Sequence, residues 1–143
     1  IQKIVSILNK KEVIIVGTGG LAREFTEYFA RHITIIGFST NNPNEHKKFD
    51  LPGKVFPSEI TLENTNCRNL VIAVGDPKLK RDLHKKFKDK GFLFPKFIHE
   101  DSIISKSVSI GEGVVISPMT IVGPNVNIGE IVYINYQVGI GHD

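Results

Sequence analysis

Cut into sixes from Ile98 onward, the chain reads IHEDSI, ISKSVS, IGEGVV, ISPMTI, VGPNVN, IGEIVY, INYQVG and IGHD. The first position of every unit is Ile or Val, and the fifth is small or β-branched in every complete unit. A period of six fits neither an α-helix nor a two-faced strand, but it fits a three-sided coil with one short strand on each side. The aliphatic first residue would fill the coil, while glycine or a small polar residue would turn each corner. Three units would then make one coil of about 18 residues.

These last residues also differ from the rest of the chain in composition. Residues 98–143 contain 10 Ile and 7 Val but no Leu, which favours strands over helices. Residues 1–97 carry 17 Lys and Arg against 10 acidic residues, whereas residues 98–143 carry one Lys against five acidic residues. We therefore expect two domains, residues 1–97 and residues 98–143.

The first domain alternates apolar runs with helical stripes. Val13–Val16, Ile33–Gly37 and Leu70–Val74 are short apolar runs typical of strands buried on both faces. A helix of about ten residues is expected from Leu21, whereas residues 39–66 are expected to be mostly loop, with a short strand near Val55. This order predicts a small, mostly parallel α/β sheet.

A second helix is expected after Asp76, a natural N-cap, with Pro77 at its first position and Gly91 beyond its end. Its buried face would carry aliphatic and aromatic residues at the spacing i, i+4 and i+8: Leu79, Leu83 and Phe87. The lysines between them, Lys80 included, would lie on the solvated side.

Several broad classes of protein are disfavoured by composition. A formal net charge of +3 on 143 residues is too small to indicate nucleic acid or a membrane surface as a partner. No apolar run approaches the roughly 18 residues that membrane insertion needs. The single cysteine, Cys67, excludes a disulfide framework and fits a reducing compartment, so we expect a cytoplasmic protein.

A glycine-rich loop joins the first predicted strand to the first helix. Residues 17–22 read GTGGLA, the G-x-G-x-x-A pattern that lets a backbone approach a pyrophosphate. An NAD site would need an acidic residue about 20 positions further on, where this chain has Ser39 and Thr40 without a carboxylate. NAD is therefore disfavoured, and the missing Gly-Lys-Ser/Thr sequence disfavours an ATP-type phosphate loop.

The whole chain resembles the bacterial sugar acetyltransferases of the hexapeptide-repeat acyltransferase family, which include sialic acid O-acetyltransferases and N-acetyltransferases of UDP-linked 4-amino sugars. Four stretches carry the resemblance: VIIVGTGGLARE at 13–24, AVGDPKLK at 73–80, FPKFIH at 94–99 and INYQVGIGHD at 134–143. The resemblance implies a Rossmann-like domain followed by a left-handed parallel β-helix, assembled as a homotrimer with active sites between chains. It implies transfer of an acetyl group from acetyl-CoA to an amino or hydroxyl group of a nucleotide-linked sugar, by direct attack on the thioester and without a metal.

The resemblance also assigns roles to residues at the end of the chain. His142 would be the general base that takes a proton from the incoming group, and Asp143 would orient it. Asn135 would lie near the acceptor sugar, or it would simply adopt a left-handed backbone at a corner. Gly139 and Gly141 are candidates to meet the acetyl-CoA thioester through a backbone N–H. From the residues alone, a solvated histidine at a chain end is the favoured interpretation of His142, and the repeat register together with the resemblance reverses that preference.

The nucleotide sugar would be bound by the first domain. The residues assigned to this site are Gly17, Gly19, Gly20, Ser39, Thr40, Gly75 and Asp76. Relatives continue for several coils beyond the histidine, so this chain, with about two and a half coils, is expected to be truncated. The alternative to an enzyme is a non-catalytic module that binds nucleotide sugars and trimerises.

Overall fold

The computed structural model describes residues 10–143 and divides the chain into two compact units. The division falls between Leu93 and Phe94, a few residues before the expected boundary at Phe97. Phe97 belongs to the first strand of the second unit, β5, Phe97–Ile98. Residues 1–9 of the expected first domain lie outside the described residues.

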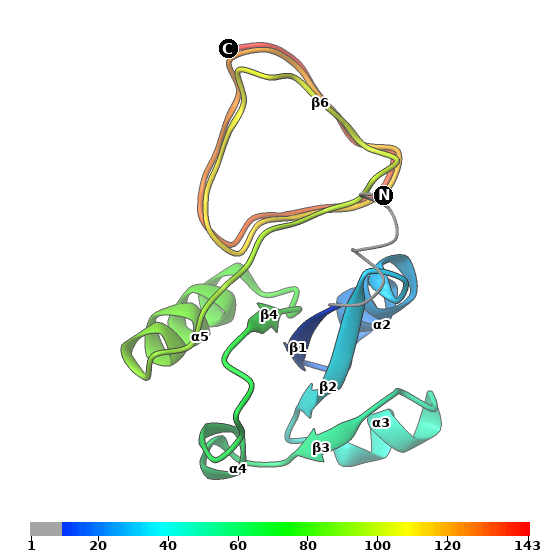
Figure 1. Cartoon of the computed structure of the whole chain (residues 1–143), viewed down its shortest axis with the longest axis vertical. Helices are drawn as coiled ribbons and strands as arrows, with labels where there is room; N and C mark the ends of the chain where they lie inside the picture. The colour runs from blue at the N-terminus through cyan, green and yellow to red at the C-terminus, as the bar shows by residue number, and fades with distance from the viewer. Residues whose placement is uncertain (1–9) are drawn as a thin grey trace. The chain divides into compact units, whose positions relative to one another are not determined.

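The first unit is built on a parallel sheet with the strand order β3-β2-β1-β4 (Figure 1). The strands are β1 (Lys11–Val16), β2 (Ile33–Ser39), β3 (Lys54–Phe56) and β4 (Leu70–Ile72). This order is that of the dinucleotide-binding fold, in which ligands bind beyond the carboxyl ends of the strands. Val13, Ile14 and Ile15 of β1 are fully buried, as expected of a central strand covered on both faces.

Within residues 10–143, the helices that accompany the sheet are α2 (Gly20–Phe29), α3 (Pro43–Lys48), α4 (Glu59–Glu63) and α5 (Pro77–Asp89). The predicted loop over residues 39–66 is wrong in part, because α3 and α4 lie within it, while β3 is the short strand expected near Val55. Both helices have local start signals, Pro43 in the first turn of α3 and a capping box between Ser58 and Thr61 in α4. Among residues 10–143, no helix is long and apolar enough to cross a membrane.

Helix α5 begins as predicted but buries a different face. The Asp76 carboxylate accepts a hydrogen bond of 2.6 Å from the backbone N–H of Leu79, and Gly91, with φ of 81°, follows the helix. The expected burial is wrong in part: Phe87 is buried as predicted, but Lys80 and His84 are buried too, and Leu79 is 48% exposed. The aliphatic stripe borders an open cleft, which periodicity cannot distinguish from a packed interior.

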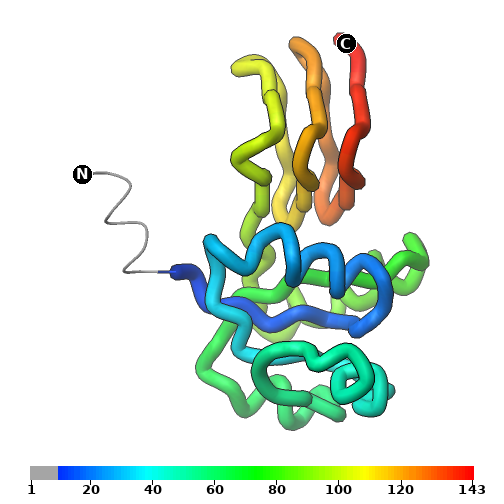
Figure 2. Tube along the Cα trace, turned by 90° about the vertical axis from the view of Figure 1, so that its right-hand side faces the viewer, coloured from blue at the N-terminus to red at the C-terminus, as the bar shows by residue number. Residues whose placement is uncertain are grey.

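The second unit is a three-sided parallel β-helix (Figure 1). Every paired strand residue lies 18 positions from its partner: Phe97 with Val115, Ile103 with Ile121, Ser109 with Asn127, Val115 with Tyr133, and Ile121 with Gly139. Figure 2 shows the coils stacked from the yellow-green start to the red end. The remaining strands are β6 (Ile103–Ile104), β7 (Ser109–Ile110), β8 (Val115–Ile116), β9 (Ile121–Val122), β10 (Asn127–Ile128), β11 (Tyr133–Ile134) and β12 (Gly139–Ile140).

The interior of the β-helix is filled by first positions of the six-residue units, as predicted, and also by fifth positions. Its buried members are Val114, Ile116, Val122, Val126, Ile128 and Ile134. Ile98, also a first position, is 43% exposed because β5 lies at the edge of its sheet and pairs with β8 alone. Burial therefore follows the repeat most closely in the middle coils.

The corners are not turned where we expected. A left-handed backbone, with φ between 53° and 66°, occurs at the fourth position of successive units: Gly113, Met119, Asn125, Ile131, Gln137 and Asp143. Two of the second-position glycines, Gly111 and Gly123, allow close packing between coils instead. A Cβ on Gly111 would lie 2.6 Å from the backbone nitrogen of Glu130, and one on Gly123 would lie 2.8 Å from the carbonyl oxygen of Gly141.

Candidate functional site

A cleft of about 590 Å³ lies in the first unit, at the carboxyl ends of β1, β2 and β3. Its polar side includes Gly17, Ser39, Thr40, Asn41, Ser58 and Glu59. Its apolar side includes Phe56, Ile60, Val74, Leu79, Leu83 and Phe87. An apolar wall with a few polar groups at one edge is the usual make-up of a small-molecule site.

Three of the seven residues assigned to nucleotide-sugar binding, Gly17, Ser39 and Thr40, line this cleft. Gly17 has φ of 106°, and a Cβ there would lie 2.9 Å from the carbonyl oxygen of Ala73, so only glycine fits. Gly19 is the N-cap of α2, and it makes no side-chain capping bond. A Cβ on Gly19 or Gly20 would meet nothing within 4 Å, so a ligand has room to approach this backbone.

Gly75 and Asp76 are not among the residues that line the cleft. A Cβ on Gly75 would meet nothing within 4 Å. The Asp76 carboxylate is used as the N-cap of α5, which is a structural role sufficient to explain it.

A carboxylate does reach the glycine-rich loop, although the sequence after β2 has none. Thr18 is 3% exposed, and its hydroxyl donates a hydrogen bond of 2.6 Å to Oε2 of Glu45 on α3. The hydroxyl groups of Thr18 and Thr40 are 3.3 Å apart, and the Thr40 hydroxyl accepts a 3.0 Å hydrogen bond from the backbone N–H of Asn42. The chain thus places an acid beside the loop by folding α3 back toward β1.

Glu45 was not predicted from the sequence, because an acidic residue was expected only directly after the second strand, at Ser39 and Thr40. The Asn42-Pro43 pair, a helix-start signal three residues before Glu45, is the signal that could have indicated α3. The hydrogen bond to Thr18 spans 27 positions and has no counterpart in the local pattern.

Ion pairs connect α4 with the end of α5, the two helices that form walls of the cleft. Glu59 of α4 binds Lys86 of α5 and, at 3.2 Å, Lys90, the C-cap of α5, and Lys90 also binds Glu63. The ammonium groups of Lys86 and Lys90 hold the pKa of Glu59 below its usual value. These charged groups are exposed, so their ion pairs contribute little to the free energy of folding.

In the β-helix, His142 follows β12 at a corner of the last coil. Its side chain is 78% exposed, and its Nδ1 lies 2.9 Å from Oδ2 of Asp143. Hydrogen bonds from the Asn125 amide and then from His142 lower the pKa of Asp143. The predicted pair of His142 and Asp143 is therefore brought together, with an ionised carboxylate against one ring nitrogen.

The other residues assigned near His142 lie in the same coil. Asn135 is exposed at the preceding corner, and its side-chain oxygen accepts a 2.9 Å hydrogen bond from the backbone N–H of Tyr136. The left-handed residue of that corner is Gln137, so the alternative reading of Asn135 as the left-handed residue is wrong. Gly139 and Gly141 are exposed, and a Cβ on either would meet nothing within 4 Å.

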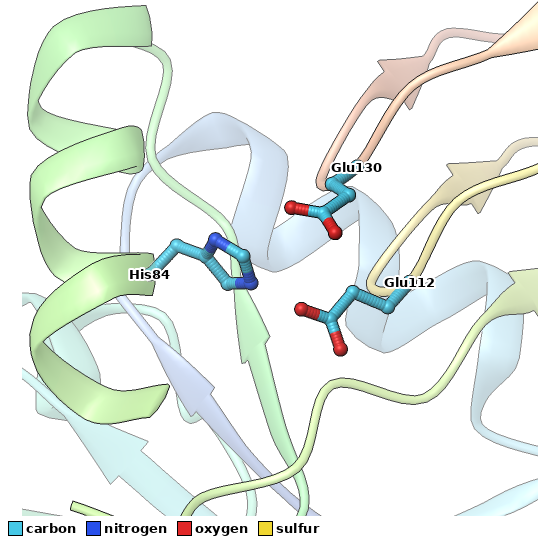
Figure 3. A group of neighbouring side chains, drawn as sticks. All are labelled: His84, Glu112 and Glu130. Atoms are coloured by element: carbon cyan, nitrogen blue, oxygen red, sulfur yellow. The ribbon is translucent and has the colours of Figure 1, made fainter. Parts of the chain in front are cut away.

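Two acidic side chains share another corner of the β-helix. Glu112 and Glu130, one coil apart, place carboxylate oxygens within 4.8 Å of each other (Figure 3). Figure 3 also draws His84, which belongs to α5 of the first unit. Two carboxylates are fewer ligands than the three or four that a protein metal centre usually supplies.

The sequence profile of the PglD N-terminal domain matches residues 12–87, more than half of the chain. The chain belongs to the PglD N-terminal domain family. Every residue that lines the cleft falls within the matched PglD region. No curated protein sequence matches the chain significantly.

Solved structures extend the likeness to both units. PerB from Caulobacter crescentus, in complex with CoA and GDP-perosamine, is 28% identical with a TM-score of 0.82, and the match covers 92% of this chain and 63% of PerB. A histidine-to-asparagine variant of perosamine N-acetyltransferase from Caulobacter crescentus is 26% identical with a TM-score of 0.79, over 92% of this chain and 63% of that one.

The acetyltransferase domain of PglB from Neisseria gonorrhoeae shares the fold, at 23% identity and a TM-score of 0.76, over 94% of this chain and 66% of that one. The predicted resemblance to bacterial sugar acetyltransferases is confirmed, as is the fold class, a Rossmann-like α/β domain followed by a left-handed parallel β-helix. The chain spans less than two thirds of the length of PerB.

Proposed function

We propose that the chain is an acetyl-CoA-dependent acetyltransferase that acts on an amino or hydroxyl group of a nucleotide-linked sugar. The observation that carries the proposal is the His142 corner, where an exposed imidazole contacts an ionised carboxylate through Nδ1. Structures similar to this one include PerB with CoA and GDP-perosamine bound, which supports the class of co-substrate and acceptor.

The chemistry assigned to His142 follows from its tautomer. An ionised carboxylate only accepts hydrogen bonds, so Asp143 requires the proton on Nδ1 and leaves the lone pair on Nε2. Nε2 then takes the proton that an incoming amine or hydroxyl loses as it attacks, and Asp143 stabilises the imidazolium formed. Acetyl-CoA, when bound, supplies the activated acetyl group. Gly139 and Gly141 offer an exposed backbone without side chains in the same coil.

The cleft of the first unit is assigned to the nucleotide part of the acceptor. The exposed glycines at the start of α2 suit a diphosphate, and the apolar wall on α5 suits a base. Glu45, held by Thr18, supplies a carboxylate of the kind that accepts hydrogen bonds from ribose hydroxyl groups in related folds. Ser39 and Thr40 line the same edge of the cleft.

The direct test is acetyl transfer by the full-length protein to UDP- and GDP-linked 4-amino sugars, followed by CoA thiol release and product mass. Replacing His142 with alanine should lower kcat by about 10²–10⁴, the usual contribution of a general base. His32→Ala, at an exposed histidine of the first unit, is the matched control and should leave kcat unchanged. Wild-type turnover by His142→Ala would remove the assigned base.

The non-catalytic alternative makes a different prediction. Calorimetry on the full-length protein should detect binding of both coenzyme A and UDP or GDP if it is an enzyme. Binding of a nucleotide without any binding of coenzyme A would instead favour a nucleotide-sugar-binding and trimerisation module.

We also propose that the protein is a homotrimer in the cytoplasm. The sheet of β6 and β9 exposes two stacked aliphatic side chains, Ile103 at 65% and Ile121 at 54%, which suit burial against another subunit. Sedimentation equilibrium should give three times the chain mass, and a monomer at micromolar concentration would contradict the assembly. Fractionation of cells that express the full-length protein checks the location.

A further inference from the structure

Three residues spaced one coil apart form a ladder of hydrogen bonds at the corner that carries His142. The backbone N–H of Asn125 donates to Oγ of Ser107 at 2.9 Å. The side-chain amide of Asn125 donates through Nδ2 to Oδ1 of Asp143 at 3.0 Å. The other carboxylate oxygen, Oδ2, lies 2.9 Å from Nδ1 of His142. The imidazole is therefore the last member of a chain of contacts that begins two coils below it.

The contacts leave one consistent assignment of protons. The Asn125 amide is the largest cause of the lowered pKa of Asp143, so the carboxylate is ionised at neutral pH and accepts from both sides. The side chain of Asp143 is 69% exposed, so water competes for it. Asn125 occupies one carboxylate oxygen and so restricts rotation of the group that His142 contacts.

Asparagine is not required at this position by the fold. The equivalent left-handed positions of the other corners hold Met119, Ile131 and Gln137 with φ between 53° and 58°. At the corner of Met119 and Gln137 the coils are bridged through the backbone, with Met119 N–H on the Asp101 carbonyl at 3.2 Å and Gln137 N–H on the Pro118 carbonyl at 3.3 Å. The backbone geometry is thus met without an amide side chain, and the amide of Asn125 needs a further explanation.

We propose that Asn125 is a positioning residue that holds the Asp143 carboxylate so that His142 keeps its proton on Nδ1 and its lone pair on Nε2. This inference rests on the proposed function of His142 as the base, and it adds a residue from a different coil that acts through the Asp143 carboxylate. Ser107 supports it by fixing the backbone of Asn125.

The test is the tautomer of His142, read by ¹⁵N NMR of the full-length protein labelled at its histidines. His142→Ala identifies the signal. Asn125→Gly removes the amide but keeps a residue that adopts the left-handed backbone, and Gln137→Gly makes the same change at another corner. We expect the Nδ1–H tautomer in the wild type and in Gln137→Gly, and a several-fold rise of the Nε2–H tautomer in Asn125→Gly. An unchanged tautomer ratio in Asn125→Gly, or Nε2–H in the wild type, would overturn the inference.

Kinetics provide a second readout. Asn125→Gly should lower kcat about tenfold or more, as loss of an orienting partner commonly does, with the acceptor KM unchanged. Asn125→Asp keeps the size but places an acceptor against Asp143, so it should lower kcat further. Equal kcat in Asn125→Gly and wild type would overturn the inference. Wild-type protein without any acetyl transfer would refute the proposed function instead, and the NMR result would then decide the ladder by itself.

Discussion

The two units of this chain differ in how directly sequence position determines environment. In the β-helix, a first-position residue of the middle coils is buried because each coil repeats the one below it at a spacing of 18. In the α/β unit, the stripe Leu79, Leu83 and Phe87 has helical spacing but lines a cleft. In a repeat, each coil is packed against coils of the same pattern, so the pattern alone predicts which residues are buried. In a single helix, the neighbouring elements decide which face is covered.

The largest expected effect tests the β-helix side of this comparison. Ile116 is fully buried between coils, so Ile116→Ala should lower the free energy of unfolding by about 2–5 kcal/mol, through lost apolar contact and the cavity left behind. Chemical denaturation measures the loss. Met119→Ala, at a corner side chain that is 55% exposed, is the control and should cost much less. Equal losses would mean that the repeat does not separate inside from outside.

The next effect tests the α/β side, where Lys80 is buried against expectation. Burial lowers the pKa of Lys80 to about 8. The unfolded chain therefore binds more protons than the folded chain between pH 8 and the ordinary lysine pKa near 10.5, so stability should rise with pH across that window. Below pH 8 the full cost of the buried charge is present, up to about 3 kcal/mol.

The comparison of Lys80→Met with the wild type isolates this effect from other titrations. Lys80→Met should be the more stable protein at pH 7, and the difference in unfolding free energy should shrink as the pH rises to about 10. Lys78→Met, at an exposed lysine paired with Asp82, should not show this trend. A pH-independent difference for Lys80→Met would show that its ammonium is solvated.

A smaller effect distinguishes two glycines at the same position of the repeat. Gly111→Ala should destabilise the protein by about 1–3 kcal/mol, because the new Cβ would lie 2.6 Å from the backbone nitrogen of Glu130. Gly129→Ala should be near neutral, because nothing lies within 4 Å of its Cβ position. Thermal unfolding of the two variants compares them directly. A neutral Gly111→Ala would mean that adjacent coils can separate at that corner without cost.

The smallest effect tests the part of α5 that sequence reasoning predicted well. Asp76→Ala removes the 2.6 Å hydrogen bond to Leu79 N–H and should cost about 1 kcal/mol in unfolding free energy. Asp76→Asn should recover most of this loss, because asparagine is also a good N-cap. A change in nucleotide affinity without any change in stability would instead support the predicted role of Asp76 in substrate binding.

The parts of the fold that sequence analysis predicted share a strong local or periodic signal. Aliphatic residues at every sixth position indicated the coil, and the Asp76-Pro77 pair indicated the start of α5. The turning position of the coil had no such signal, since Gly113, Met119 and Ile131 share no chemical property. Their conformation follows from coil geometry, and glycine at the second position was a misleading guide.

The contacts of the candidate site also divide into those that the sequence predicts and those that it does not. His142 and Asp143 are neighbours in the chain, so their contact was accessible from the sequence. Glu45 reaches Thr18 across 27 positions, and Asn125 reaches Asp143 across 18. The predicted coil of about 18 residues places Asn125 beside Asp143 but does not indicate which of their atoms bond. The contact of Glu45 depends on how α3 folds back, which no spacing in the sequence reports.

The spacing of the ladder restricts how the length of this region can change in evolution. An insertion or deletion of six residues between Asn125 and Asp143 would preserve the hydrophobic repeat but rotate the histidine to a different edge of the prism. Only a change of 18 residues, one full coil, would return the imidazole to the vertical line of Ser107 and Asn125. Natural length variants that retain this ladder should therefore differ by whole turns.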